Sequence, residues 1–424
     1  MNSFTIRPGP VNGTVRAPPS KSYTHRALVV GHLAHRRFRV VRPLDSDDTR
    51  ATAEAAATLG TPVRYGRDAW SLGPPSPESP RGSVLVRCGE SGTTLRFFAV
   101  LAGLRERAVL LTGAGRLAER PIDALLDAMR SLGATSRHLQ GKGFPLEVRG
   151  PMRGGRVSLD VSESSQFASA LLVALPTLED DSSLELAGTV VSRPYIEATL
   201  AVLARHGVRV ERRGRRFLIA GGQRYQGTEF RVPGDASSAA YLWTAAAVAG
   251  GRVRVRGIPK AWPQADLAIL DLLERTGAAV TRQPDGATVS GAARRPFRVD
   301  LTDAPDLYPL AGVLAATTSG VSRIVGAEHV VLKESDRKAG TGRLARRLGA
   351  KVETVPNGLR IEGTNQPKSL DLSDITDHRL VMSAAVAALA GDGRSVVGDR
   401  RAVRKSFPGF WAALSSVSGG NSRA

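Results

Sequence analysis

Six stretches of the chain begin with a polar turn and continue as an apolar, alanine-rich run. In the first of them, Ser20 precedes apolar residues at Ala27, Leu28 and Leu33, which share one face of a helix. Serine is a favoured N-cap, so we expect this helix to begin near Lys21. The six starts lie between 69 and 73 residues apart, which indicates an internal repeat. The six stretches are SKSYTHRALVVGHLA from Ser20, GESGTTLRFFAVLAG from Gly89, SESSQFASALLVALP from Ser162, GDASSAAYLWTAAAVAG from Gly234, DAPDLYPLAGVLAATTSG from Asp303 and DITDHRLVMSAAVAALAG from Asp374.

A second helical pattern follows each of these runs, and five of the six second patterns close in a glycine turn and a short strand. Runs with alternating apolar positions, such as SVLVR, RVSLDV and FRVD, lie between the helices and favour β-strands. Each repeat is therefore a βαβαβ-type module of about 70 residues. Three modules make about 210 residues, a usual domain size. We predict an α/β (α+β) fold with six modules, three in each of two domains.

The domain boundaries are expected where the repeat is interrupted. The segment YQGTEFRVPGD separates two helical units, and a proline pair precedes Ser20. We predict a first domain over residues 19–232 and a second over residues 1–18 together with 233–424, which includes the N-terminal strand SFTIRPG. If the first helices of each domain pack side by side, their positive N-terminal ends converge on the inter-domain cleft and can hold anions. A purely architectural repeat is the alternative, and the polar residues of the turns decide between the two.

The composition of the chain bears on whether it binds nucleic acid or a membrane. The net charge is +20, but only 8 of the 59 basic residues are lysine, and the arginines are spread along the whole chain with few aromatic residues among them. This pattern indicates a compositional bias rather than a nucleic-acid surface, so we expect no nucleic-acid partner. No apolar run approaches the roughly 18 residues of a membrane helix, and the N-terminus lacks the pattern of a signal peptide. We expect a cytoplasmic protein without a membrane partner.

The sequence offers little for a metal or an organic cofactor. Cys88 is the single cysteine, which excludes an internal disulfide and a cysteine-built zinc site. His32 and His35 are three residues apart on the first helix, but no cysteine or carboxylate joins them nearby, so we interpret them as packing or surface residues. The phosphate-binding patterns GxxxxGK[ST] and strand-GxGxxG-helix are both absent.

The turns and the stretches between them carry basic, hydroxyl and acidic residues in a fixed order. They are SKSYTHR from Ser20, SGTTLR from Ser91, AERPID around Arg120, SSQ from Ser164, SRPY from Ser192, DAPD up to Asp306, LKESDR around Lys333, DHR up to Arg379 and RKSFPGF around Lys405. From about Ile6 to Phe410 this series resembles the 5-enolpyruvylshikimate-3-phosphate synthases. The resemblance implies the two-domain enolpyruvyl transferase fold, an active site in the inter-domain cleft, no cofactor and a monomeric enzyme.

The resemblance also implies a reaction and a set of site residues. The enolpyruvyl group of phosphoenolpyruvate would pass to the 5-hydroxyl of shikimate 3-phosphate, with release of phosphate, in the shikimate pathway to chorismate and aromatic amino acids. The catalytic positions are Lys21, Asp306 and Glu334. The positions for shikimate 3-phosphate are Lys21, Ser22, Arg26, Ser164, Ser165, Gln166, Ser192, Tyr195, Asp306 and Lys333. The positions for phosphoenolpyruvate are Lys21, Gly92, Thr93, Arg120, Gln166, Arg337, Arg379 and Lys405.

The chemistry of these residues suits that reaction. The two substrates bring two phosphates and two carboxylates together, so the site needs many donors; arginine suits bidentate capture and lysine is a compact point charge. Transfer needs a base for the 5-hydroxyl, for which we assign Asp306, and an acid for the methylene carbon, for which we assign Glu334 and Lys21. Two positions depart from the pattern: Glu90 and His329 stand where many bacterial relatives have asparagine, so a direct substrate contact at Glu90 is in doubt.

Two other readings compete. The related transferase that acts on UDP-N-acetylglucosamine has Lys-Asn where this chain has Lys21-Ser22, and it uses a cysteine on a mobile loop, whereas Cys88 lies just before SGTTLR. A binding protein of the same repeat superfamily, either RNA-handling or enzymatically inactive, would lack residues such as Glu334 or Arg379, and both are present.

The scarcity of lysine generates the first testable prediction. In a chain where arginine fills most basic positions, a lysine within a motif indicates a site that a broad guanidinium cannot serve. We expect Lys21→Arg to keep the charge yet lower turnover by roughly tenfold or more, which is about 1.4 kcal/mol of barrier. Lys368→Arg, outside any motif, is the control and should be neutral in steady-state kinetics, with folding checked by circular dichroism. Wild-type turnover in Lys21→Arg would mean that only charge matters at this position.

Overall fold

The chain forms two compact units in a computed structural model that describes residues 4–75, 83–141, 143–372, 374–419 and 422–423. The continuous unit is Pro19–Val232, and the discontinuous unit joins Met1–Pro18 to Pro233–Ala424.

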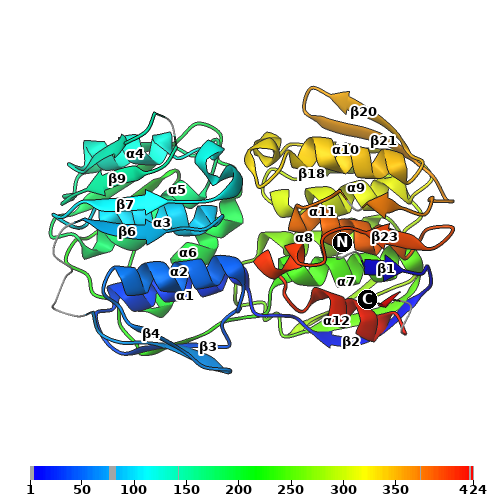
Figure 1. The fold of residues 1–424 in the computed structure, drawn as a ribbon, viewed down its shortest axis with the longest axis horizontal. Coiled ribbons are helices and arrows are strands. Elements are labelled where there is room, and N and C mark those ends of the chain that lie inside the picture. The colour runs from blue at the N-terminus through cyan, green and yellow to red at the C-terminus, as the bar shows by residue number, and fades with distance from the viewer. Residues whose placement is uncertain (1–3, 76–82, 142, 373, 420–421, 424) are drawn as a thin grey trace. The chain divides into compact units, whose positions relative to one another are not determined.

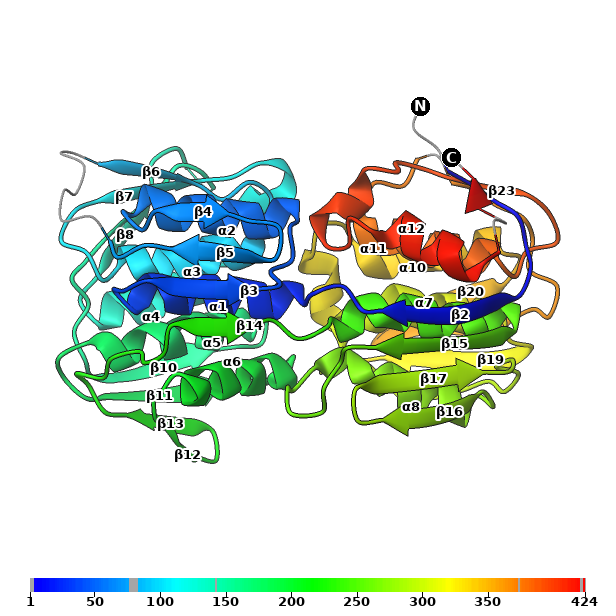
Figure 2. The same ribbon diagram turned by 90° about the horizontal axis from the view of Figure 1, so that it is seen from below.

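Helices and short strands alternate through the continuous unit (Figures 1 and 2). Its helices are α1 (Lys21–Leu33), α2 (Asp47–Thr58), α3 (Gly92–Ala102), α4 (Asp123–Ser131), α5 (Gln166–Ala174) and α6 (Arg193–Arg205), with the 3-10 helices η1 (Gly115–Glu119) and η2 (Leu175–Thr177). Its strands are β3 (Phe38–Val41), β4 (Val63–Tyr65), β5 (Ala69–Leu72), β6 (Val84–Arg87), β7 (Val109–Thr112), β8 (Thr135–His138), β9 (Leu146–Arg149), β10 (Arg156–Asp160), β11 (Ser182–Ala187), β12 (Glu211–Arg213), β13 (Arg216–Ile219) and β14 (Glu229–Arg231).

The discontinuous unit has the same alternation. Its helices are α7 (Ala236–Ala249), α8 (Ala268–Arg275), α9 (Tyr308–Ala316), α10 (Arg337–Arg347), α11 (His378–Ala388) and α12 (Phe410–Val417), with the 3-10 helices η3 (Ala265–Leu267), η4 (Pro305–Leu307), η5 (Glu328–Leu332) and η6 (Ala402–Lys405). Its strands are β1 (Phe4–Ile6), β2 (Val11–Arg16), β15 (Gly251–Arg256), β16 (Ala279–Gln283), β17 (Gly286–Ser290), β18 (Arg298–Asp300), β19 (Gly320–Val325), β20 (Lys351–Val355), β21 (Gly358–Gly363), β22 (Asp371–Leu372), β23 (Ser395–Val397) and β24 (Ser422–Arg423).

One sheet topology recurs in both units. Within the described ranges the strands form six four-stranded sheets, each with one parallel pair followed by two antiparallel neighbours. In the continuous unit the orders are β14-β3-β5-β4, β6-β7-β9-β8 and β10-β11-β13-β12. In the discontinuous unit they are β16-β17-β15-β2, β18-β19-β21-β20 and β22-β23-β1-β24. The predicted mixed α/β class is confirmed.

The helices divide into two kinds, as their composition requires. The first helix after each polar turn is buried on nearly all sides: every residue of α9 and of α11 is buried. The second helix is amphipathic and buries one face only; α8, for example, buries four of its eight residues. The first helices therefore form the centre of each core, and their polar N-terminal turns emerge at its edge.

The predicted first helix begins where expected, because α1 starts at Lys21 with Ser20 at the N-cap. The Ser20 side chain makes no capping hydrogen bond; instead the carbonyl oxygen of Ser20 accepts from the Thr24 hydroxyl at 2.8 Å. Strands were also predicted at SVLVR, RVSLDV and FRVD, and they correspond to β6, β10 and β18.

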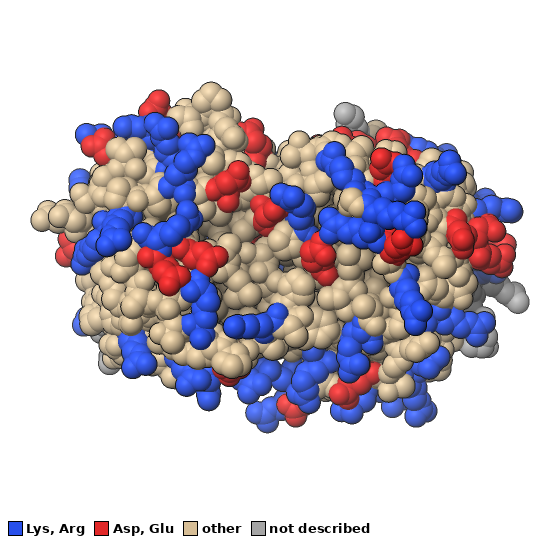
Figure 3. Space-filling view, turned by 180° about the vertical axis from the view of Figure 1, so that it is seen from behind, with Lys and Arg blue, Asp and Glu red and all other residues tan. Residues whose placement is uncertain are grey.

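Basic side chains are scattered over the surface. On the face drawn in Figure 3, lysine and arginine lie among aspartate and glutamate rather than in one continuous stripe. In the described part of the chain, no helix combines the length and apolar character needed to cross a membrane.

Buried neutral histidines give the second prediction. Burial lowers the pKa of His25, His32 and His329 to about 3 in the folded chain, against 6.5 in an ordinary histidine. Because only the unfolded chain binds these protons between pH 6.5 and 3, stability should fall as the pH drops through this window. Each histidine contributes up to about 2 kcal/mol of the loss between pH 8 and 5.

His32→Gln tests the point at one site. Glutamine can keep the hydrogen bond that the His32 ring makes with the Thr61 hydroxyl at 2.8 Å, but it cannot take up a proton. Urea denaturation of the variant should lose about 2 kcal/mol less stability than the wild type between pH 8 and 5. Equal losses in the two proteins would contradict the burial argument for His32.

Candidate active site

Most of the residues predicted to bind substrate in the continuous unit stand at the starts of four helices. Lys21 begins α1, Gly92 begins α3 and Gln166 begins α5. Ser192 is the N-cap of α6, in the left-handed conformation with φ of 55°. Free backbone N–H groups at helix starts attract anions, so the local fold suits phosphate and carboxylate ligands.

Arg26 makes hydrogen bonds with one group of residues on α1 and α6. Its guanidinium donates to the Ser22 carbonyl oxygen at 2.9 Å, to the Tyr195 carbonyl oxygen at 2.8 Å and to the Thr199 hydroxyl at 2.9 Å. Burial lowers the pKa of Arg26 to about 10, so the side chain stays charged near neutral pH. All three acceptors are neutral. Arg26 therefore ties α1 to α6 and leaves its positive charge uncompensated by these contacts.

A second group surrounds Gln166. The Arg96 guanidinium donates to the Gln166 side-chain oxygen at 2.8 Å and to the Pro121 carbonyl oxygen at 2.9 Å, and the Gln166 amide donates to the Thr93 hydroxyl at 3.2 Å. Arg96 was not among the predicted site residues, although it lies in the same SGTTLR motif as Thr93. Beside Gln166, the Ser164 hydroxyl accepts from the Gln166 backbone N–H at 3.2 Å. Ser165 is the N-cap of α5 and is buried.

Gly92 and Arg120 are in close contact. A β-carbon added at Gly92 would lie 2.7 Å from the Arg120 Cζ and Nη1 atoms, well inside van der Waals contact. Only a glycine lets this guanidinium lie against the first turn of α3. The structure therefore brings together two residues assigned to phosphoenolpyruvate from widely separated motifs.

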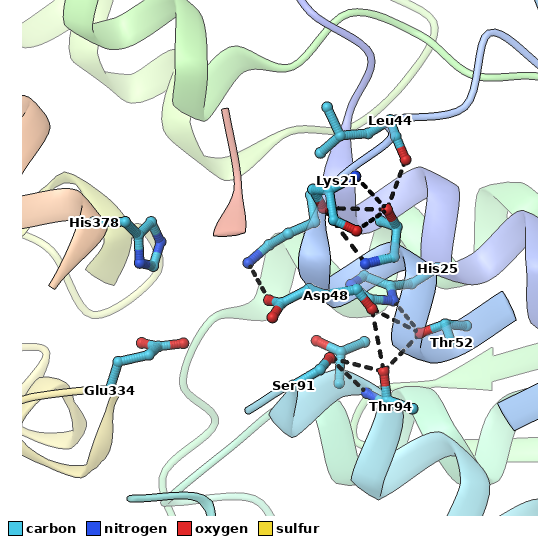
Figure 4. Close-up of polar contacts among 12 residues, drawn as sticks. Lys21, His25, Leu44, Asp48, Thr52, Ser91, Thr94, Glu334 and His378 are labelled. Carbon is cyan, nitrogen blue, oxygen red and sulfur yellow. Dashed lines mark hydrogen bonds and ion pairs between the residues drawn. The ribbon is translucent and has the colours of Figure 1, made fainter. Parts of the chain in front are cut away.

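Lys21 pairs with a carboxylate that the sequence did not single out. The Lys21 ammonium group donates to the Asp48 side chain at 2.9 Å, as Figure 4 shows. The Asp48 side chain is 7% exposed and that of Lys21 is 17% exposed. The sequence shows Asp48 only as an aspartate near the start of the second helical pattern. Because aspartates also stabilise helix starts, this position did not identify Asp48 as the partner of Lys21.

The predicted residues of the discontinuous unit meet at one arginine. The Arg337 guanidinium contacts Asp306 at 2.9 Å, Glu334 at 2.6 Å and Asp377 at 3.1 Å. Burial alone would lower the pKa of Arg337, but attraction to the three carboxylates outweighs it and raises that pKa. Arg379 contacts the other oxygen of Asp306 at 2.5 Å. Both oxygens of Asp306 are thus held by guanidinium groups.

Asp377 is the member of this cluster that sequence reasoning missed. One of its carboxylate oxygens accepts from the Arg379 backbone N–H at 2.8 Å, where it caps α11, and the other contacts Arg337. Burial alone would raise the pKa of Asp377, but Arg337, His378 and the hydrogen bond from Ser335 together outweigh it and lower that pKa. The position of Asp377 directly before His378 and Arg379, at the start of an apolar helix, could have indicated from the sequence that it belongs to the site.

The remaining predicted residues lie near these groups within their own units. Lys333 follows η5 directly and precedes Glu334. Lys405 ends η6, which packs against α11. His329, one of the two departures from the family pattern, is buried and electrostatically coupled to Lys333 and Asp306. Glu90, the other departure, is exposed, and its carboxylate lies against Gly115.

Comparison with known proteins decides the family. A family model described as EPSP synthase (3-phosphoshikimate 1-carboxyvinyltransferase) matches residues 6–414. The chain belongs to the EPSP synthase family. Proteins named 3-phosphoshikimate 1-carboxyvinyltransferase from Methanoculleus marisnigri and Thermococcus kodakarensis are each 41% identical over 411 residues; these alignments cover 96% of this chain and 97% and 98% of those proteins.

The fold of the EPSP synthase family is also seen in solved structures. The EPSP synthase of Acinetobacter baumannii matches with a TM-score of 0.80, 23% identity and coverage of 98% of both chains. The family reaction transfers the enolpyruvyl group of phosphoenolpyruvate to shikimate 3-phosphate, in the shikimate pathway. The family resemblance and the fold class predicted from the sequence are therefore confirmed, whereas the individual site residues remain predictions.

Gly92→Ala tests the contact with Arg120. The new methyl group must push the guanidinium away, and folding should survive because the displaced group is the far end of a flexible side chain. We expect the KM for phosphoenolpyruvate to rise about tenfold, equivalent to about 1.4 kcal/mol of binding, with the melting temperature little changed. Gly342→Ala within α10 is a matched control, because its β-carbon would meet nothing nearer than 3.5 Å. An unchanged KM in Gly92→Ala would remove Arg120 from the phosphoenolpyruvate site.

Proposed function

We propose that this chain transfers the enolpyruvyl group from phosphoenolpyruvate to the 5-hydroxyl of shikimate 3-phosphate, with its two units in different roles. The observation that carries this proposal is the Arg337 cluster, in which the two carboxylates assigned to proton transfer, Asp306 and Glu334, share one buried guanidinium. The cluster brings the candidate base and one candidate acid next to the same side chain, and the reaction needs a base and an acid close to each other.

The continuous unit would supply most of the binding groups for shikimate 3-phosphate. Hydroxyl groups and backbone N–H groups at the starts of α5 and α6 suit its phosphate, and Arg26 and Lys21 add positive charge. The same unit would hold part of phosphoenolpyruvate through Arg120 and Gln166. Arg337, Arg379 and Lys405 of the discontinuous unit would complete the phosphoenolpyruvate set, and Lys333 would add a contact to shikimate 3-phosphate.

The chemistry proceeds in two steps. Asp306 accepts the proton of the 5-hydroxyl group of shikimate 3-phosphate, and the oxygen of this hydroxyl group bonds to C2 of phosphoenolpyruvate. At the same time the methylene carbon of phosphoenolpyruvate takes a proton from an acid, for which Glu334 and Lys21 are the candidates. The tetrahedral ketal then loses a proton from the new methyl group and expels phosphate. Two guanidinium groups on Asp306 favour its ionised form, which is the form a base requires.

We propose that the chain acts in the cytoplasm as a monomer, as the family resemblance implies. Analytical ultracentrifugation with and without both substrates checks the monomeric state, and a sedimentation coefficient of a dimer would contradict it.

Phosphate release tests the function directly. We expect release only when phosphoenolpyruvate and shikimate 3-phosphate are both present, and none when UDP-N-acetylglucosamine replaces shikimate 3-phosphate. Asp306→Asn should lower kcat by about a hundredfold, or about 2.7 kcal/mol of barrier, because the amide cannot accept the proton. Asp285→Asn, an exposed aspartate on a turn of the same unit, should leave kcat unchanged.

Two results would overturn this assignment. Phosphate release with UDP-N-acetylglucosamine would favour the related transferase. A kcat for Asp306→Asn within threefold of the wild type would leave the function standing but would take the base role away from Asp306.

A further inference from the structure

The Asp48 carboxylate occupies a place that its own helix does not require. It stands in the first turn of α2 beside Asp47, and either aspartate can stabilise a helix start. Asp47 is exposed, whereas Asp48 is buried and directed at the Lys21 ammonium group (Figure 4). A buried carboxylate is unfavourable unless it is paired, so the pair with Lys21 at 2.9 Å accounts for its burial.

The backbone around Asp48 is fixed by capping bonds. Ser46, the N-cap of α2, and Thr49 form a reciprocal capping box, in which the Ser46 N–H donates to the Thr49 hydroxyl at 3.0 Å and the Thr49 N–H donates to the Ser46 hydroxyl at 3.4 Å. The Thr49 hydroxyl also donates to the Leu44 carbonyl oxygen at 2.6 Å. The Leu44 N–H in turn donates to the Thr24 hydroxyl at 3.0 Å, which ties this loop to the first turns of α1.

A chain of buried side chains then joins three helices beneath the ion pair. The His25 ring of α1 bonds the Thr52 hydroxyl of α2 at 2.6 Å, and that hydroxyl bonds the Thr94 hydroxyl of α3 at 2.7 Å. Thr94 donates to the Ser91 hydroxyl, next to Gly92, at 2.8 Å. Figure 4 shows this series from His25 through Thr52 and Thr94 to Ser91. The starts of the three helices are therefore held in one arrangement.

The charge state of His25 leaves the ion pair undisturbed by the neighbouring ring. His25 lies within the electrostatic reach of both Asp48 and Lys21. Burial lowers the pKa of His25 to about 3, so the ring is neutral near pH 7. A neutral ring neither competes for the Asp48 carboxylate nor repels the Lys21 ammonium group.

We propose that Asp48 is a positioning residue for Lys21. The capping box and the His25–Thr52–Thr94 series fix the Asp48 carboxylate, and this carboxylate holds the Lys21 ammonium group where the anionic substrates bind. This inference rests on the proposed function of Lys21. Without Asp48, the flexible four-carbon stem would let the ammonium group move among several rotamers. Each reaction cycle would then include the entropic cost of ordering this side chain.

Steady-state kinetics with matched variants provide the first test. Asp48→Asn keeps the shape but removes the charge, and we expect kcat to fall about tenfold with a change of less than twofold in the KM for shikimate 3-phosphate. Asp47→Asn, in the same helix turn, is the control and should behave as the wild type. Asp48→Glu should recover part of the loss, because it restores the charge on a longer side chain.

A double-mutant cycle separates positioning from a merely structural role. In a Lys21→Ala background, the further change Asp48→Asn should lower the residual rate by less than twofold, because the group that Asp48 positions is already gone. Equal losses with and without Lys21 would overturn the proposal. If Asp48→Asn lowers the melting temperature by more than about 5 °C, Asp48→Glu serves in the same cycle, since it keeps a charge at the helix start.

A measurement independent of turnover keeps this inference distinct from the proposed function. With only eight lysines, acylation of each can be followed by peptide mass spectrometry under a limiting anhydride. The Lys21 amine should react several-fold faster in Asp48→Asn than in the wild type, because its ion pair is lost, whereas Lys368 should react equally in both. An unchanged rate at Lys21 would overturn the positioning role. Failure of phosphate release in the wild type would instead overturn the function and leave the ion pair standing.

Discussion

A charged group that leaves water must find a partner, and the candidate active site depends on how this chain meets that demand. Arg337 is 1% exposed, and its guanidinium contacts three carboxylates that come from separate segments: Asp306, Glu334 and Asp377. Removing one partner of a buried ion pair typically costs about 3–5 kcal/mol, because an uncompensated charge remains. The cation and the acids therefore hold one another, and the segments that carry them are fixed at one point.

In the continuous unit, two arginines make hydrogen bonds with neutral acceptors. Arg26 donates to two carbonyl oxygens and a threonine hydroxyl, and Arg96 donates to the Gln166 side chain and a proline carbonyl oxygen. Neutral acceptors fix the Arg26 guanidinium without cancelling its charge, so this position suits an incoming phosphate or carboxylate. Lys21 differs, since its described partner is the carboxylate of Asp48. That difference suits a residue assigned to proton transfer as well as to binding.

Local signals in the sequence predicted the helices of this site, but not the partners of its charges. Ser20 followed by an apolar run predicted the start of α1, because both signals lie within one turn of the chain. Asp48 is 27 residues from Lys21, and Asp377 is 40 residues from Arg337. Such pairs depend on how helices pack, which a single sequence does not specify. Asp377 was also concealed by its second role, because an aspartate before an apolar helix is explained by capping alone.

Long-range strand pairing further limits how much of the fold can be predicted from the sequence, and it bears on the ion pair between Lys21 and Asp48. Strand β2 pairs with β15, with a contact between residues 240 apart, and β14 at the end of the continuous unit pairs with β3 near its start. Each of these sheets takes one strand from a distant segment. Strand β2 belongs to the discontinuous unit and α1 to the continuous unit, so the chain passes between the units just before α1. Lys21 is only the third residue of the continuous unit. The segment that precedes it belongs to the other unit, and the contact with Asp48 on α2 ties the ammonium group to a second helix of its own unit.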